Sequence, residues 1–429
     1  MYKIAVCGFG TVGKSFVNHF LKYQKKISDN CSSELAINMI ADRSIESKRF
    51  DNKDIRFSSN VLEVINSDCD LIVEAIGGTD ISLEIVRKSI NEGKSVITAN
   101  KALLAEYGDE LFKIAKQNNV YLGFEASVAG AIPIINTLLH NYSNEQISSI
   151  TGIINGTCNF ILDEMFTSKK SFSKSLKDAQ NQGYAESDPT FDIGGIDAAH
   201  KISILAMLAF NIKSPFKRMF IEGIDSIESM DIDYANELGY KIKHIASASS
   251  TNNIIECKAH PVLINKSHIL ASIDGVMNAV LVKGDRFGTS MLYGHGAGGD
   301  ATASAVVSNI KDFCDFKNLK SKHDLSYFNL DSCDDIKSIG NLISQYYLRI
   351  FAKDVTGVMA EITSTLASHN ISIEAVTQHE PLNEDDIIPI VMITDSVEYK
   401  NIESAITQIS SLHNIHGKIQ LIRVFNESE

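Results

Sequence analysis

The sequence predicts an α/β protein made of three successive domains. From Tyr2 to about Gly130, short apolar runs alternate with segments of helical periodicity, which favours a doubly wound parallel sheet. Beyond Ile132, helices and strand-like runs are grouped, which favours an α+β domain with an open, largely antiparallel sheet. From about Tyr346 the order is β-α-β-β-α-β, which is typical of a ferredoxin-like module.

The first domain, residues 1–132, combines strand-like runs with helical segments such as GKSFVNHFLKYQ and ISLEIVRKSINEG. Because crossovers between parallel strands are right-handed, these helices should cover both faces of the sheet. The expected strands are KIAVCG, INMIAD, LIVEAIGG, SVITAN and VYLGFEA.

The second domain, residues 133–320, begins with the helix IPIINTLLHNY and the strand ISSITGIIN. Further helices run to Ile212, and the strand-like runs IIECKAHPVLI and NAVLVKG follow. SNIKDFCDFKNLKSKHDLSYFN is expected to be a helix that runs into a polar connector, residues 321–345. This arrangement leaves room for the end of the second domain to pack back on the first.

The third domain, residues 346–429, has the strands YYLRIFA, ISIEAVTQHE, IIPIVMIT and GKIQLIRVF. Its helices are GVMAEITSTLASHN and NIESAITQISSLH, and LNEDD forms an acidic turn. Because the block has a complete strand and helix order of its own, we expect a self-contained module outside any catalytic core.

Composition excludes several kinds of partner. The 53 acidic and 40 basic residues give a formal charge of -13, which repels nucleic acid and anionic membrane surfaces. The N-terminus lacks the basic and apolar regions of a secretory signal, and the longest apolar stretch is far below the ~20 residues of a membrane span, so we expect a cytoplasmic protein. Seven scattered cysteines without a C-x-x-C pair are expected to be reduced thiols, and no Cys and His cluster suggests a metal.

GFGTVG, at the end of the first strand, predicts a dinucleotide site. Gly8 permits the tight turn, Gly10 lets a pyrophosphate approach the main chain, and Gly13 lets helix and strand pack closely. At the end of the second strand, Asp42 favours NAD and Arg43 favours NADP, so the preference stays open, and both are alternatively solvated loop charges. The expected cofactor residues of the turn are Gly8, Phe9, Gly10, Thr11, Val12 and Gly13.

Two further motifs lie at the carboxyl ends of strands, where ligands bind in open α/β sheets. AIGG contributes Gly77 and Gly78, and TANKALLA contributes Thr98 and Lys101. Lys101 is either an ordinary surface lysine or an active-site group beside the nicotinamide.

GYAESDPTFDIGGIDAAHKISILA places charge ahead of an apolar helix. Asp197 and Lys201 are four residues apart and share a helix face, which by itself is an ordinary salt bridge. The helix is apolar nearly all round, however, so a buried polar site explains the pair better. Carboxylates at Glu186, Asp188 and Asp192 suit a substrate that carries an ammonium group.

Taken together, six motifs in this order resemble homoserine dehydrogenase over about residues 1–310, and KDVTGVMAEITSTLASHNISIEAV resembles an ACT domain. The motifs are GFGTVG, TANKALLA, FEASVAGAIPII, NGTCNFIL, GYAESDPTFDIGGIDAAHKISILA and GHGAGGDATASAVVSNI. The resemblance implies NAD(P)-dependent reduction of L-aspartate 4-semialdehyde to L-homoserine, a step towards threonine, methionine and isoleucine. The alternatives are a non-catalytic sensor of NAD(P) and amino acids, or a dehydrogenase of another small amino-acid aldehyde.

The resemblance also assigns roles to residues. Lys201 corresponds to the family's catalytic lysine, Lys101 is the rival proton donor, and Asp197 orients the lysine and holds substrate. The substrate pocket is expected to be lined by Glu186, Asp192, Asp197, Tyr184, Gly156 and Thr157, and the cofactor is approached also by Gly183 and Gly298.

FEASVAGAI corresponds to a turn that binds Na+ or K+ through main-chain carbonyls. Separately, Ala301 stands where the family usually has proline.

In the ACT domain, Asp354 and Gly357 lie in the loop expected to bind an amino acid, with L-threonine as the expected feedback inhibitor. The alternative is an ACT domain that serves only as a dimer interface. The open sheet suggests a dimer, and paired ACT domains would make a tetramer. In the FEASVAGAI turn, the main-chain carbonyls expected to bind the Na+ or K+ ion are those of Glu125, Val128, Gly130 and Ile132.

Overall fold

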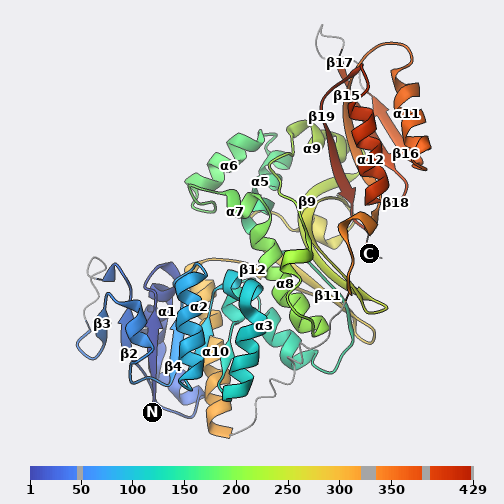
Figure 1. The fold of residues 1–429 in the computed structure, drawn as a ribbon. Coiled ribbons are helices and arrows are strands. Elements are labelled where there is room, and N and C mark those ends of the chain that lie inside the picture. The colour runs from blue at the N-terminus through green and yellow to red at the C-terminus, as the bar shows by residue number, and fades with distance from the viewer. Residues whose placement is uncertain (46–51, 320–334, 379–386, 427–429) are drawn as a thin grey trace.

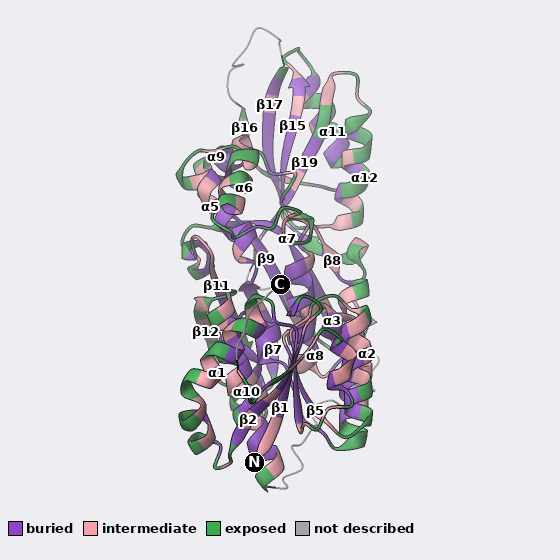
Figure 2. Cartoon of the chain, turned by 90° about the vertical axis from the view of Figure 1, so that its left-hand side faces the viewer, coloured by how far each residue is buried: buried purple, intermediate pink, exposed green. Residues whose placement is uncertain are grey.

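The computed structural model describes residues 1–45, 52–319, 335–378 and 387–426. The chain forms two large sheets that lie one after the other along an elongated molecule, with strands buried in the middle and exposed helix faces outside (Figure 1 and Figure 2). The acidic turn LNEDD, residues 382–386, and part of the expected connector lie outside the described residues.

The N-terminal sheet is parallel, with the strand order β3-β2-β1-β4-β5-β6 that a doubly wound domain requires. Each strand that the sequence predicted is present, and β3 is additional. The helices are α1 (Thr11–Asn30), α2 (Asp80–Asn91) and α3 (Lys101–Asn118). The strands are β1 (Tyr2–Cys7), β2 (Leu35–Ala41), β3 (Arg56–Ser58), β4 (Leu71–Glu74), β5 (Ser95–Thr98) and β6 (Leu122–Gly123).

A helix from much later in the chain completes this domain. Helix α10 (Gly299–Leu319) packs against α1, and its Val306, Ile310 and Phe313 share a core cluster with Phe16 of α1. The chain therefore returns to the first sheet after the five strands of the second domain.

The second sheet begins with five antiparallel strands in the order β12-β11-β7-β9-β10. One face is covered by α8 (Ile196–Phe210) and α5 (Gly156–Thr167), and α8 also contacts α3 of the first domain. This α8 contact joins the two sheets. The strands are β7 (Ile147–Ile153), β9 (Tyr240–Thr251), β10 (Ile254–Asn265), β11 (Met277–Gly284) and β12 (Gly288–His295).

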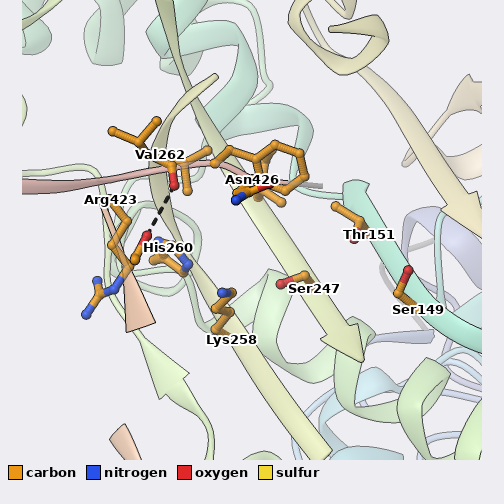
Figure 3. Close-up of a pocket in the computed structure, with 12 residues that line it drawn as sticks. Ser149, Thr151, Ser247, Lys258, His260, Val262, Arg423 and Asn426 are labelled. Carbon is orange, nitrogen blue, oxygen red and sulfur yellow. Dashed lines mark hydrogen bonds between the residues drawn. The ribbon is translucent and has the colours of Figure 1, made fainter. Parts of the chain in front are cut away.

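The opposite face of these strands is partly open. A short 3₁₀ helix, η6 (Ile269–Ser272), covers one end. Elsewhere small hydroxyl side chains such as Ser149, Thr151 and Ser247 line the surface (Figure 3), next to the exposed Met291 and Tyr293. The hollow shown in Figure 3 has a volume of about 20 Å³, which is room for little more than a water molecule.

The C-terminal module has the expected β-α-β-β-α-β order and the strand order β19-β15-β17-β16. The expectation that it is self-contained is wrong, because β19 pairs in parallel with β10 at Val262 and Leu263, so that both modules share one sheet (Figure 3). The elements are β15 (Tyr346–Lys353), α11 (Val358–Ser368), β16 (Ile373–Gln378), β17 (Ile387–Thr394), α12 (Tyr399–Ser410) and β19 (Ile415–Val424).

The C-terminal module joins the second sheet because one edge of β10 would otherwise be free. Three short parallel pairings cover this edge in succession: β13 (Asp335–Ile336) at its start, β8 (Phe220–Ile221) in the middle and β19 at its end. Each pairing satisfies main-chain groups that an edge strand would otherwise leave open.

A buried ion pair reinforces the junction. Arg349 of β15 donates from Nε to Asp231 Oδ1 at 2.7 Å and from Nη2 to Oδ2 at 3.1 Å, and the Tyr347 hydroxyl donates to Oδ1 at 3.0 Å. Asp231 belongs to α9 (Ser229–Glu237) of the second domain. Arg349 is 2% exposed and Asp231 is 0% exposed, so the two modules share a desolvated charge pair.

The helices that the structure describes include none with the length and apolar character to cross a membrane. The six described cysteines are free thiols.

Candidate active site

The glycine-rich turn between β1 and α1 is shaped for a phosphate. Gly8 has φ +99°, and a Cβ on Gly13 would lie 1.9 Å from the Gly8 carbonyl oxygen. A Cβ on Gly10 would meet no atom within 4 Å, so its surface is open. The first turn of α1 has no acidic residue and no side-chain cap, which leaves its N–H groups available to an anion.

Asp42 braces this turn from the end of β2. Its Oδ2 accepts the Phe9 N–H at 2.7 Å, and its Oδ1 accepts the N–H and the hydroxyl of Ser44, both at 2.8 Å. Arg43 is exposed. A cavity of about 550 Å³ opens beside the turn, and its lining includes Gly8, Gly10, Asp42, Arg43, Ser44, Gly77 and Gly78.

A buried carboxylate that the sequence patterns did not indicate organises the ends of β4 and β5. Glu74 accepts the Thr98 hydroxyl at 2.5 Å and the Ile76 N–H at 2.9 Å. Because the Thr98 side chain is buried and engaged here, a contact with a cofactor would have to come from its main chain. The Asn100 side chain caps α3 and donates to the Gly78 carbonyl at 2.6 Å, which ties Lys101 to the cavity wall.

Asp197 joins two lysines from different domains. The Lys201 ammonium lies 2.8 Å from Asp197 Oδ2, and the Lys101 ammonium lies 2.7 Å from Oδ1. Lys201 also donates to the Ile154 carbonyl at 2.7 Å. Its side chain is 9% exposed, whereas that of Lys101 is 34% exposed and has its ammonium 5.3 Å from the Phe191 ring centre. We call Lys101, Asp197 and Lys201 the lysine bridge.

The two lysines differ in acidity. Burial lowers the pKa of Lys201, and attraction by Asp197 offsets this only in part. Burial also acts to lower the pKa of Lys101, but the charge and hydrogen bond of Asp197 outweigh it, so this pKa is raised. Burial would raise the pKa of Asp197, but the two ammonium groups hold it well below its usual range. Lys201 is therefore the lysine that releases a proton more readily.

Asn155 holds the neighbouring carboxylates. Its Nδ2 donates to Asp197 Oδ2 at 3.0 Å and to Asp192 Oδ1 at 3.1 Å, while its Oδ1 caps α5. Burial, together with the charge of Asp197, raises the pKa of Asp192. The Thr157 hydroxyl donates to the Tyr184 carbonyl at 2.7 Å. The segment of Gly156 and Thr157, which is expected to line the substrate pocket, thus begins beside the lysine bridge.

Other residues that the sequence predicted to bind substrate or cofactor lie at the edge of this site. Glu186 and Tyr184 are exposed, and the charge of Glu186 acts on Lys101. Gly183 and Gly298 have positive φ, and a Cβ added to either would meet no atom within 4 Å, so both surfaces are open. Gly156 instead packs against the Val276 carbonyl, where a Cβ would come within 2.7 Å, so its absent side chain serves close packing.

The expected cation turn is buried and tightly wound. Ala129 and Gly130 have φ +55° and +48°, and a Cβ on Gly130 would lie 2.8 Å from the Gly296 carbonyl oxygen. Glu125 is 1% exposed, and its carboxylate accepts the N–H groups of Ile135 at 3.0 Å and Asn136 at 2.7 Å. Its side chain therefore caps the following helix, and only its main-chain carbonyl is offered to an ion. Val128 and Ile132 of this turn are also buried.

The glycine-rich turn, the cavity beside it and the lysine bridge are together typical of an NAD(P)-binding oxidoreductase. Three family models match: "Homoserine dehydrogenase, NAD binding domain" over residues 8–125, "Homoserine dehydrogenase" over 133–310 and "ACT domain" over 346–414. The chain belongs to the homoserine dehydrogenase family.

Individual relatives match most or all of the chain. A homoserine dehydrogenase of Neisseria gonorrhoeae is 42% identical, with 98% of each chain covered. The crystal structure of a homoserine dehydrogenase from Thiobacillus denitrificans matches with TM-score 0.92 and 38% identity, covering 99% of this chain and 98% of that one. A hyperthermophilic archaeal homoserine dehydrogenase in complex with NADPH matches with TM-score 0.61 and 27% identity, covering 72% of this chain and 96% of that one.

Proposed function

We propose that the enzyme reduces L-aspartate 4-semialdehyde to L-homoserine with NAD(P)H, reversibly, at the lysine bridge. The main support for this proposal is one buried carboxylate, Asp197, which forms ion pairs with two lysine ammonium groups beside the dinucleotide cavity. The nicotinamide, when bound, supplies the hydride. Lys201, with its lowered pKa, donates a proton to the oxygen of the reduced carbonyl and takes one up in the reverse direction.

Lys101 is the second candidate for the proton donor. Its greater exposure and its link through Asn100 to the Gly78 carbonyl favour this role. In either case Asp197 keeps both lysines in place and compensates part of their charge.

The substrate is proposed to bind with its ammonium group near Glu186 and Asp192, in a pocket that Tyr184, Gly156 and Thr157 also line. Asp192 supports this role because it is half-buried, next to the lysine bridge, and bonded to Asn155. The charge compensation between a ligand ammonium and these carboxylates would replace interactions with water.

NADP(H) is proposed as the preferred cofactor. Both Asp42 oxygens are engaged by Phe9 and Ser44, whereas Arg43 is exposed on the cavity wall where a 2′-phosphate would lie. The archaeal relative with NADPH supports the same choice.

A Na+ or K+ ion is further proposed at the main-chain carbonyls of Glu125, Val128, Gly130 and Ile132. Activity measured with each cation, compared with activity in choline, tests this cation site.

Regulation and assembly are proposed as well. Gly357, with φ +100°, is the N-cap residue of α11, and Asp354 is exposed in the same loop, which supports an amino-acid loop with L-threonine as feedback inhibitor. Activity that is unchanged at millimolar threonine would contradict this role.

The open sheet face with Met291 and Tyr293 supports a dimer. We propose domain boundaries at 1–132, 133–320 and 346–429, with 321–345 as connector.

The assay follows NADPH and NADH oxidation with aspartate semialdehyde for the intact protein, Lys201→Ala and Lys101→Ala. We expect Lys201→Ala to lose at least ~100-fold in kcat, as is typical for loss of a general acid, and Lys101→Ala to raise KM more than it lowers kcat. The reverse pattern would assign the proton to Lys101. Turnover of other small amino-acid aldehydes at equal kcat/KM would contradict the proposed substrate.

A further inference from the structure

The side chain of Asn278 is buried where the start of α5 meets the loop that follows β12. It is 1% exposed, and neither its Nδ2 nor its Oδ1 has a hydrogen-bond partner among the residues that the structure describes. Asn278 is the second residue of β11 and pairs with Gly294 of β12. Because a buried amide without partners lowers the stability of the folded state, such groups are rare and are retained where they serve binding or catalysis.

Two glycines make room for this amide. A Cβ added to Gly296 would lie 1.8 Å from Asn278 Nδ2, so the amide occupies the space of the missing side chain. A Cβ added to Gly156 would lie 3.5 Å from Asn278 Oδ1. Gly156 begins α5, directly after Asn155, which bonds to both aspartates of the site. The amide therefore lies between the expected substrate segment and residues 296–298, which we call the GAG loop.

The far end of the GAG loop contacts the cofactor side of the site. Gly298 has φ +119° and an open surface, and Gly299 begins α10. A Cβ on Gly299 would lie 2.6 Å from Ser15 Oγ and 3.1 Å from Thr11 Cγ2, so this end packs directly on the start of α1. The N–H groups there are the ones available to a pyrophosphate. A cofactor bound at this turn would therefore restrict the GAG loop.

The near end of the GAG loop is held by the expected cation turn. The Ala131 N–H donates to the His295 carbonyl at 3.1 Å, and a Cβ on Gly130 would lie 2.8 Å from the Gly296 carbonyl oxygen. With the main chain held, the Asn278 amide is the group that can adjust, because rotation about its terminal torsion costs little. The first N–H groups of α5, which have no partner within that helix, lie on its other side.

We propose that Asn278 is a positioning residue for the reaction, and that its amide hydrogen-bonds the main chain of the GAG loop and of the Gly156 segment when NAD(P)H is bound. These bonds would fix the substrate side of the site against the cofactor side, as hydride transfer requires. The kinetic consequences rest on the proposed function, whereas the stability and the amide exchange of the protein do not.

Thermal unfolding of the ligand-free protein tests whether the amide is unpaired at rest. Asn278→Leu keeps the branched shape without polar atoms, and Asn278→Ala guards against crowding. We expect at least one of them to melt at or above the temperature of the intact protein. Asn309→Leu is the matched control and should melt a few degrees lower, because the buried Asn309 amide is bonded to the Glu125 N–H at 2.9 Å and to Asp312 at 3.2 Å. A fall as large as this in both Asn278 variants would overturn the proposal.

Hydrogen–deuterium exchange with and without NADPH tests the bonds themselves and needs no turnover. In the intact protein, NADPH should slow exchange in residues 8–13, 155–158 and 294–299. In Asn278→Leu, protection of residues 8–13 should remain, while that of residues 155–158 should fall several-fold. Equal protection in the variant, or protection in the intact protein that does not reach residues 155–158, would overturn the proposal.

Kinetics test the positioning role. We expect Asn278→Leu and Asn278→Ala to lose at least ~10-fold in kcat, while the KM for NADPH stays within about two-fold because the turn after β1 is unchanged. Unchanged kcat in both variants would overturn the proposal. An intact enzyme that reduces a different aldehyde with the same dependence on Asn278 would contradict the proposed substrate and leave the role of Asn278 standing.

Asn278→Asp adds a readout that a purely structural role would not move. Burial favours the protonated carboxyl, which keeps one hydrogen-bond donor and one acceptor, whereas the ionised form has acceptors only. The ratio of its kcat to that of the intact protein should therefore rise several-fold as the pH falls from 8 to 6. A ratio that does not change with pH would count against hydrogen bonding by this side chain during turnover.

Discussion

At the residue scale, the site depends on a carboxylate shared between two lysines. The four-residue spacing of Asp197 and Lys201 predicted their contact, and the structure has it at 2.8 Å. No local spacing predicts Lys101 as the other partner, because it lies nearly a hundred residues away on α3 and meets Asp197 only when α3 packs against α8. Asn155 directly precedes Gly156 and Thr157 of the expected substrate pocket, but its bonds to both aspartates depend on tertiary contacts.

Glu125 makes a pH-dependent contribution to stability that can be measured. Burial, opposed by the N–H groups of Asn136 and Ile135, raises its pKa to about 7, above its ordinary value of 4.5. The protonated form is favoured in the folded state, so its contribution is full below about pH 4.5 and is lost as the pH rises through about 7. The loss amounts to about 3 kcal/mol, an order-of-magnitude figure.

Glu125→Gln should remove this dependence. We expect the free energy of unfolding of the variant to change less between pH 5 and 8 than that of the intact protein, in denaturant titrations at fixed salt and cation. Glu92→Gln, an exposed glutamate after α2, is the matched control and should keep the original slope. Parallel slopes for Glu125→Gln and the intact protein would show that this carboxyl does not titrate in the window.

At the element scale, alternation of apolar runs and helical periodicity predicted the strands and helices of the first domain and the order of the last. Strand β3 was missed because Arg56–Ser58 has three residues and no apolar run. The expected helix IPIINTLLHNY is divided into a short α4 (Ile134–Asn136) and a π-helical turn (Thr137–Asn141), which periodicity cannot distinguish.

Two glycines of the first turn should respond differently to alanine. In Gly13→Ala, the new Cβ would lie 1.9 Å from the Gly8 carbonyl oxygen, so we expect a loss of about 1–3 kcal/mol in stability as well as of cofactor binding. In Gly10→Ala the Cβ meets no protein atom, so stability should stay within about 0.5 kcal/mol while NADPH affinity falls.

Thermal unfolding and fluorescence titration with NADPH measure the two effects separately. An unchanged NADPH affinity in Gly10→Ala would show that the pyrophosphate does not lie against this turn. Equal melting temperatures for the two variants would contradict the close packing at Gly13.

At the scale of the whole molecule, the sequence indicated three domains but not how they join. Parallel pairing of β10 with β19 leaves no local signature, because two residues of each strand make it and more than 150 residues separate them. The Arg349 and Asp231 pair was equally invisible, since each residue alone reads as a surface charge.

This ion pair predicts a strongly non-additive pair of variants. Arg349→Met leaves Asp231 buried without its cationic partner, and Asp231→Leu leaves Arg349 with only the exposed Glu228, 3.2 Å away. Each single variant should cost about 3–5 kcal/mol, whereas the double variant should cost clearly less than the sum. Denaturant unfolding of the intact protein and the three variants gives the coupling energy. Additive losses would show that the pair is solvated in solution.

The covered edge of β10 also bears on how the chain is made. Ile415, where β19 begins, is synthesised about 150 residues after the end of β10, a delay on the order of 10–30 s at usual translation rates. During that interval the edge of β10 that faces away from β9 has no strand to pair with at Val262 and Leu263, and an open strand edge can pair with another nascent chain. Completion of the ACT domain thus covers this part of the edge and removes one route to aggregation.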